Sequence, residues 1–258
     1  MTLKISVLGC GNSTGVPMLG PIWGACDPDE PKNRRLRPAV VIERAGKRVL
    51  IDAGPDIRQQ LLSADIGWVD AILFTHHHAD HTAGIDDLRA LTIARRAPID
   101  IYADRSTLDD LDRRFPYMFG RGGRTGYYDK PTLIPHEAGD RLPLDGLDLT
   151  LFRQDHVVTT SIGVRVGPFA YSTDVQDLDD HAWATLAGVD TWLVAAVRRE
   201  PHIAHAHLEK VLGWIERLRP RNAYLTHLNH TMDYATLCHE LPAGVAPAFD
   251  GLVLEFES

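Results

Sequence analysis

The sequence THHHADH, at residues 75–81, decides how the fold of this chain is interpreted. It follows an apolar run at residues 71–74 that predicts a strand. After it, Ile85, Leu88 and Thr92 recur at helical spacing, which predicts a helix beginning just beyond the motif. The chain has 13 histidines among 258 residues, so composition alone rarely produces an H-x-H-x-D-H pattern. The motif therefore indicates a site rather than a chance cluster.

The spacing of this motif suits metal ions. His76 and His78 lie two apart at a strand end, where alternate side chains point to the same side, so they can share one metal. Asp80 and His81 follow at the turn into the helix and can reach a second metal. Imidazole and carboxylate ligands suit zinc, manganese or iron, so ligand type alone leaves the metal open.

Three further metal-type side chains stand where predicted strands stop. His156 follows a strand at 147–152, Asp174 follows one at 169–172, and His227 follows one at 223–225. A lone histidine is more often an ordinary loop residue, and an aspartate after Ser-Thr is usually a turn or helix-cap residue. Because the 75–81 motif needs more ligands than one loop supplies, we interpret all three as candidates for the same site.

The rest of the chain reads as short strands alternating with helices, typical of a layered α/β protein, and we expect one domain over residues 1–258. Further strands are predicted at 4–8, 39–44, 48–52, 99–103, 161–166, 191–196 and 252–256, and helices at 106–114, 177–186 and 208–218. Residues 115–136 are aromatic, glycine-rich and basic without clear periodicity. We interpret them as a long surface loop, which leaves open whether it contacts substrate.

The composition narrows the classes of partner. The formal net charge of -8 argues against binding an extended nucleic acid through a broad basic face, although a local basic patch can hold a phosphate. The three scattered cysteines fit neither a disulfide framework nor a four-cysteine zinc module, which favours a reducing cytoplasm. No apolar stretch has the length of a signal-peptide core or a bilayer span, so we expect no membrane partner.

Taken together, these motifs resemble those of the metallo-β-lactamase superfamily over nearly the whole chain. The five matching motifs are Leu50-Ile51-Asp52-Ala53-Gly54, residues 76–81, His156, Ser172-Thr173-Asp174 and Leu225-Thr226-His227. The resemblance implies a four-layer αβ/βα sandwich with two divalent metal ions, zinc or manganese, at one edge. It assigns one metal to His76, His78 and His156, the other to Asp80, His81 and His227, with Asp174 bridging. Asp52 would hold a ligand histidine or the loop in place, or else cap the Gly54 turn.

Residues 9–17 (GCGNSTGVP), 23–24 (WG) and 225–230 (LTHLNH) are similar to the PhnP-like phosphodiesterases, whose best-known member acts on cyclic ribose phosphates. That relative also has a structural zinc held by three cysteines and a histidine matching His230. Here Ala25 and Asp27 stand at two of the cysteine positions and Cys26 is out of register, so we predict no third metal. His230 is then expected to support the metal ligands from behind or to be a loop residue.

The same branch implies a catalytic histidine just before a helix. His205, in the run 201–208, matches that position as general acid, and an exposed loop histidine is the alternative. Asp80 is the other residue expected to take part in catalysis. Arg121 and Arg124, like the basic run at 32–37, are candidates to bind a substrate phosphate, although solvated surface charge is the commoner explanation.

The predicted function is that of a dinuclear metal-dependent phosphodiesterase, in which a hydroxide between the metals attacks a small, for example cyclic, phosphodiester or nucleotide. A tRNA 3′-end endonuclease is an alternative, with residues 113–130 as its basic arm. Hydrolysis of a thioester or lactone is another. A nucleotide-binding metalloprotein without turnover is the alternative from outside the enzymes, and a homodimer is left open.

Overall fold

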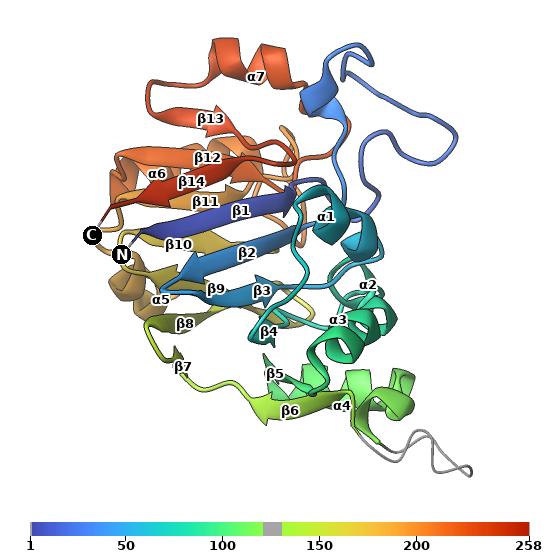
Figure 1. Ribbon diagram of the computed structural model, residues 1–258. Coiled ribbons are helices and arrows are strands. Elements are labelled where there is room, and N and C mark those ends of the chain that lie inside the picture. The colour runs from blue at the N-terminus through green and yellow to red at the C-terminus, as the bar shows by residue number, and fades with distance from the viewer. Residues whose placement is uncertain (1, 121–130, 258) are drawn as a thin grey trace.

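Two β-sheets lie face to face in the computed structural model, which describes residues 2–120 and 131–257 (Figure 1). Within these residues each sheet has seven strands. The first contains, in spatial order, β14 (Val253–Phe256), β1 (Leu3–Gly9), β2 (Ala39–Arg44), β3 (Lys47–Ile51), β4 (Ala71–Leu73), β5 (Ile99–Ala103) and β6 (Leu133–Glu137). The second contains β13 (Val245–Pro247), β12 (Asn222–Thr226), β11 (Thr191–Ala195), β10 (Phe169–Ser172), β9 (Thr160–Val166), β8 (Leu147–Asp155) and β7 (Arg141–Leu144).

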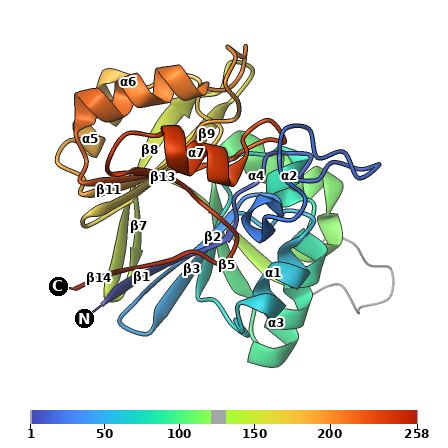
Figure 2. The ribbon, with the colours of Figure 1, turned by 90° about the horizontal axis from the view of Figure 1, so that it is seen from above.

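Helices cover the outer faces of both sheets, as Figure 2 shows from above. On the first sheet lie α1 (Ile57–Ser63), α2 (Ala79–Thr82), α3 (Leu88–Arg95) and α4 (Arg105–Arg114), and on the second α5 (Asp180–Leu186), α6 (Leu208–Leu218) and α7 (Tyr234–Glu240). Short 3-10 helices occur at Pro31–Asn33, Ile85–Asp87 and Pro116–Phe119. The layers run helix, sheet, sheet, helix, which confirms the predicted four-layer αβ/βα sandwich.

Apolar residues fill three layers of core, one between the sheets and one under each set of helices. Strand β8 shows why the inner layer forms, because its buried and exposed residues alternate and Leu147, Leu149 and Leu151 all face the other sheet. In β11 every residue is buried, as expected for a central strand covered on both sides. Burial of each such aliphatic side chain contributes roughly 1.5–3 kcal/mol, which makes the two sheets a rigid support.

The parallel strands of both sheets deliver the predicted ligands to one edge. In the first sheet β3 runs parallel to β4, and in the second β10, β11 and β12 run parallel to one another. Asp52 and Thr75 lie just beyond β3 and β4, while Asp174 and His227 lie just beyond β10 and β12. Because the carboxyl ends of parallel strands meet at the same edge of a sheet, the motifs converge although they are scattered in sequence.

Several elements differ from the sequence predictions. Helices α1 and α7 and strands β6, β7 and β13 were not predicted. The helix expected after the 75–81 motif is divided into α2, the Ile85–Asp87 turn and α3. The chain bends where Gly84 packs on Gly54, so closely that a Cβ on Gly84 would come within 2.0 Å of the Gly54 carbonyl oxygen. The helix expected from residue 177 begins at 180, where the Asp179 side chain caps it by accepting from the Ala182 amide.

The interpretation of residues 115–136 as one loop was wrong at both ends. Its start forms the Pro116–Phe119 turn, and its end belongs to β6, which pairs in parallel with β5. Pro135 hides this strand in the sequence, but β6 is the edge of its sheet, where a proline costs no ladder hydrogen bond on the open side. None of the helices in the described residues has the length and apolar character that a bilayer crossing requires.

Candidate metal centre

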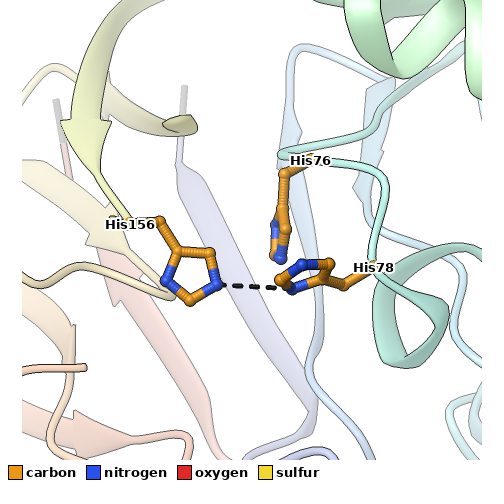
Figure 3. A group of neighbouring side chains, drawn as sticks. All are labelled: His76, His78 and His156. Carbon is orange, nitrogen blue, oxygen red and sulfur yellow. Dashed lines mark hydrogen bonds between the residues drawn. The ribbon is translucent and has the colours of Figure 1, made fainter. Parts of the chain in front are cut away.

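Three histidines from two different sheets form the first cluster. His76 and His78 come from the turn between β4 and α2, and His156 comes from the loop after β8 (Figure 3). One ring nitrogen from each lies within 4.8 Å of the corresponding nitrogens of the other two, and His156 Nε2 is 3.3 Å from His78 Nδ1. Figure 3 shows the rings pointing toward a common centre. The spacing is that of ligands that could share one ion.

The second cluster contains Asp80, His81, Asp174 and His227. The Oδ2 atom of Asp174 is 2.9 Å from His81 Nε2. Its Oδ1 atom is 3.5 Å from His227 Nε2 and 3.7 Å from His156 Nε2. Asp174 therefore lies between the two clusters, in the position expected of a bridging carboxylate. The structure thus brings all seven predicted ligands together, and their binding of metal stays a prediction.

The backbone is strained where these side chains leave their strands. Asp52, Asp174 and His227 have φ values of 64°, 47° and 57°, in the left-handed region that non-glycine residues avoid. Asp52 and His227 directly follow β3 and β12, and Asp174 follows β10 after one residue, so all three lie at the turns by which the chain leaves the sheets. Such conformations cost about 1–3 kcal/mol each and cluster at functional sites.

Asp52 lies directly behind the metal-type residues. Its carboxylate is fully buried and accepts hydrogen bonds from the Thr75 amide at 2.7 Å and the Thr75 hydroxyl at 2.8 Å. His81 Nδ1 is 2.7 Å from Asp52 Oδ2 and donates to it, which leaves His81 Nε2 facing Asp174. Of the two roles left open by the sequence, this geometry supports holding a ligand histidine over capping the Gly54 turn.

A backbone carbonyl orients His156 in a similar way. Its Nδ1 atom lies 2.8 Å from the carbonyl oxygen of Ala204 and donates to it, so Nε2 is left to face Asp174 and His78. Arg114 of α4 supports the histidine turn from outside, because it donates to the His77 carbonyl at 3.0 Å and to the Thr82 hydroxyl at 2.9 Å. Sequence reasoning missed both contacts, since a carbonyl and a distant arginine leave no local pattern.

The electrostatics of the site favour cations. Burial lowers the pKa of His76, His78 and His227, which keeps these rings neutral as metal ligands must be. At His81 burial acts the same way, but the carboxylates of Asp80, Asp174 and Asp52 outweigh it and raise the pKa of the imidazole. The carboxylates around His81 thus give the second cluster a negative potential that favours binding of a cation.

Orphaned polar atoms provide a test of whether metal ions fit. His81 Nε2 faces carboxylate oxygens of Asp174 and Asp80 at 2.9 and 3.3 Å, whereas His76 Nε2 is buried and has no hydrogen-bond partner within the described residues. Buried polar atoms are seldom left in this state. Neutral imidazole nitrogens and carboxylate oxygens in this number are a donor set for divalent metals, so the residues present fit such ions.

His205 lies beside both clusters, in the segment before α6. Its Nδ1 atom is 3.4 Å from Asp174 Oδ1, and its side chain is 18% exposed. Burial, helped by the neighbouring His227 and His156, lowers the pKa of His205 to about 3 against the opposing effect of Asp174. The prediction that it is an exposed loop histidine is therefore disfavoured by geometry, whereas its catalytic role stays a prediction.

The remaining candidates lie elsewhere. His230 packs against the N-terminal loop, where its carbonyl accepts from the Ala25 amide at 2.9 Å and a Cβ on Gly24 would approach its ring to 2.3 Å. Arg121 and Arg124 lie outside the described residues.

A family model and a solved structure both match this chain over most of its length. Residues 47–228 match the model of the beta-lactamase superfamily domain. A solved structure described as a new diphosphatase from the PhnP family superposes with a TM-score of 0.90 at 35% identity and covers 99% of this chain and 98% of its own.

Two curated relatives match over part of their own length. An octanoyltransferase of Porphyromonas gingivalis is 33% identical over 97% of this chain but only 51% of that protein. A ribonuclease Z of Bradyrhizobium is 29% identical over 52% of this chain and 44% of that protein. The chain thus spans about half the length of the curated relatives it matches.

Proposed function

Because the chain belongs to the metallo-β-lactamase superfamily, and within it to the PhnP-like proteins, we propose that it hydrolyses a small phosphodiester with two divalent metal ions. The observation that carries this proposal is the position of Asp174, whose two oxygens face His81 on one side and His156 and His227 on the other. A carboxylate between two histidine clusters is the arrangement that a dinuclear hydrolytic centre requires.

Each group in the site would then have a distinct task. His76, His78 and His156 would hold one ion, and Asp80, His81 and His227 the other, with Asp174 shared between them. The metal pair, when bound, would supply a water of lowered pKa and positive charge for the phosphoryl oxygens. Asp52 and the Ala204 carbonyl would fix the ring orientations of His81 and His156.

His205 would act on the leaving group. Its ring lies 4.8 Å from that of His156 and 5.3 Å from that of His227, which puts it next to the predicted reaction centre. An imidazole with a low pKa is neutral and a poor acid, but an anionic phosphodiester beside it would raise its pKa. Protonated in that complex, His205 could donate to the departing alkoxide.

Hydrolysis of bis-p-nitrophenyl phosphate tests the proposal. Metal-depleted protein should be inactive, and Mn²⁺ or Zn²⁺ should restore turnover as about two ions bind per chain. A parallel screen of cyclic ribose phosphates and cyclic nucleotides would then identify the natural class. Two bound metals without turnover on any diester would reject the proposal and favour a nucleotide-binding protein.

A tRNA endonuclease is the second candidate, because a ribonuclease Z matches about half of the chain. The net charge of -8 opposes it, since tRNA binding draws its affinity from Lys and Arg contacts to phosphates. The two candidates separate in a tRNA-precursor binding and cleavage assay under salt titration. Weak, salt-independent binding without 3′-end cleavage would leave the small diester as the substrate.

The name of the octanoyltransferase relative raises acyl chemistry as a further alternative. Since the match covers about half of that protein, its acyl transfer could reside in either half. Hydrolysis of p-nitrophenyl octanoate, measured beside the phosphodiester, would reveal an esterase activity on an eight-carbon acyl group. We expect the ester to react far more slowly than the diester, because the proposed metal pair and acid would act on a phosphoryl group and no residue is assigned as an acyl nucleophile.

A further inference from the structure

A cavity of about 640 Å³ lies between the N-terminal loop and α1, and none of the seven predicted metal ligands lines it. Its walls include residues 15–17 and 34–37 of the N-terminal loop, residues 59–64 of α1 and its end, and Asp250 before β14. In Figure 1, α1 stands beside the end of β1, below the N-terminal loop. The volume is that of a site for a small organic molecule.

The Gly54 turn connects the wall of this cavity to the metal centre. A Cβ added to Gly54 would come within 2.0 Å of the Asp80 carbonyl oxygen and within 3.5 Å of Arg37 Cβ. Arg37, which lines the cavity, and the Asp80 backbone therefore both pack against the Gly54 turn. The cavity is close to the predicted reaction centre but is not part of it.

Three arginines give the cavity a positive wall. Arg34 is exposed and, within the described residues, makes no ion pair; its guanidinium lies 4.9 Å from the centre of the Trp23 ring. Arg37 pairs with Asp56 at 3.0 Å, and Asp56 is the carboxylate that offsets its charge. Planar guanidinium groups are the side chains best suited to binding phosphate.

The third arginine, Arg35, is the unusual one. Its side chain is 1% exposed, and its guanidinium donates to the Asn229 carbonyl at 3.3 Å, to Asn33 Oδ1 at 3.2 Å and to Cys26 Sγ at 3.8 Å, none of which is a carboxylate. No carboxylate among the described residues lies within ion-pair distance of it. A buried cation without a paired charge is costly, so an anion in the adjoining cavity would stabilise it.

One carboxylate in the wall, Asp250, offsets part of this charge. Asp250 lies near Arg35, but both of its oxygens already accept backbone hydrogen bonds, from the Cys10 amide at 2.9 Å and the Leu36 amide at 2.7 Å. Beside Arg35, the wall adds the apolar Val16 and Pro17, which offer a surface for packing against an organic group. Polar Gln59 and Ser63 stand at the exposed side of the helix.

We propose that this cavity is a second ligand site, which binds the phosphate group of a small phosphorylated molecule at Arg34 and Arg37 against the buried charge of Arg35. The phosphate has two possible sources, a separate phosphorylated compound or a second phosphate on the substrate itself. Both would use the same guanidinium contacts and differ in their effect on turnover.

Calorimetric titration of the metal-loaded protein with ribose 5-phosphate tests the site. Arg34→Ala combined with Ser63→Asp removes a charge and adds an opposing one at exposed positions, so the fold should persist. Loss of a charge-assisted contact should weaken binding at this site about tenfold or more. The matched control is Arg58→Ala, on the same helix, exposed and outside the cavity, which should leave binding unchanged.

A crystal soaked with tungstate should show anomalous density between Arg34 and Arg37. Suppose that the site takes a second phosphate of the substrate. The KM of the double variant should then be raised for a p-nitrophenyl diester of a nucleoside that carries a 3′-phosphate. Its KM for bis-p-nitrophenyl phosphate, which has no second phosphate, should stay unchanged. If the site takes a separate compound, both KM values should stay unchanged while ribose 5-phosphate binding is lost. The proposal would be overturned if the double variant and Arg58→Ala bound ribose 5-phosphate equally well and no tungstate density appeared. These experiments measure binding and not turnover, so that outcome would leave the proposed hydrolysis untouched.

Discussion

Replacing Asp52 with asparagine should weaken metal binding although all seven predicted metal-ligating residues remain. The buried carboxylate holds three hydrogen bonds, two from Thr75 and one from His81 Nδ1. If the oxygen of the new amide side chain kept the bond from the Thr75 amide, its NH₂ group would face His81. His81 Nδ1 would then have to accept, and the ring proton would move to Nε2, the atom that faces Asp174.

The expected size follows from that bond. Loss of a hydrogen bond to a charged group costs about 1.5–3 kcal/mol, or roughly 10- to 150-fold in an equilibrium constant. Residues that orient metal ligands typically cost about 10- to 100-fold in metal affinity or activity when mutated. We therefore expect Asp52→Asn to weaken the ion at the second cluster by about 10- to 100-fold and to lower turnover at limiting metal.

Competition with a chromophoric chelator measures this affinity, and circular dichroism verifies folding. The matched control is Asp104→Asn, a buried carboxylate that caps α4 through the Thr107 amide at 2.7 Å and takes no part in the histidine cluster. It should cost little stability, because asparagine caps a helix about as well as aspartate does, and no metal affinity. Folded Asp52→Asn protein with wild-type metal affinity and turnover would refute the assigned contact as a positioning device.

Three further predictions concern catalysis, metal and pH. His205→Ala should lower turnover of an alkyl diester by about 10²- to 10⁴-fold with metal content unchanged, whereas exposed His239→Ala should match wild type in the same assay. Chelation should lower the melting temperature, since an ion at 100 times its Kd contributes about 2.7 kcal/mol, and an unchanged thermal scan would contradict the site. Burial raises the pKa of Asp250 to about 6 against about 3.9 unfolded, so the native state holds the proton more tightly. Its contribution of about 3 kcal/mol should be full below pH 4 and lost as pH rises through 6, and urea unfolding should show a flatter pH profile for Asp250→Asn.

The sequence predicted the site better than it predicted the chain around it. The 75–81 motif and the strand-end positions of His156, Asp174 and His227 depend on local spacing, and the structure brings them together as expected. The divided helix after the motif depends on the close packing of Gly84 on Gly54, a contact between segments 30 residues apart. No periodicity within residues 82–95 reports such a contact.

The contacts that orient the predicted metal ligands could not be predicted from the sequence for the same reason. The bond from His156 to the Ala204 carbonyl joins residues 48 positions apart, and any residue could supply that carbonyl. Asp52 was identifiable because it sits in a recognisable motif, but its choice between His81 and the Gly54 turn required the fold. The buried Arg35 had been interpreted as part of a surface basic run, and its burial follows only from the packing of residues 23–37 on 229–234.

The strained residues connect the fold to the chemistry. Asp52, Asp174 and His227 are held in left-handed backbone at about 1–3 kcal/mol each, and three carboxylates are crowded around His81. Neither the left-handed backbone nor the crowding of carboxylates stabilises the chain by itself. Both are imposed by the buried strands, which hold these residues in place. A bound divalent cation would offset the crowded negative charge directly, so the cost of the site should be largest when the metals are removed. The rigid sheets therefore act as the source of preorganisation, and the loss of stability on chelation should exceed that expected of metal binding at a flexible surface loop.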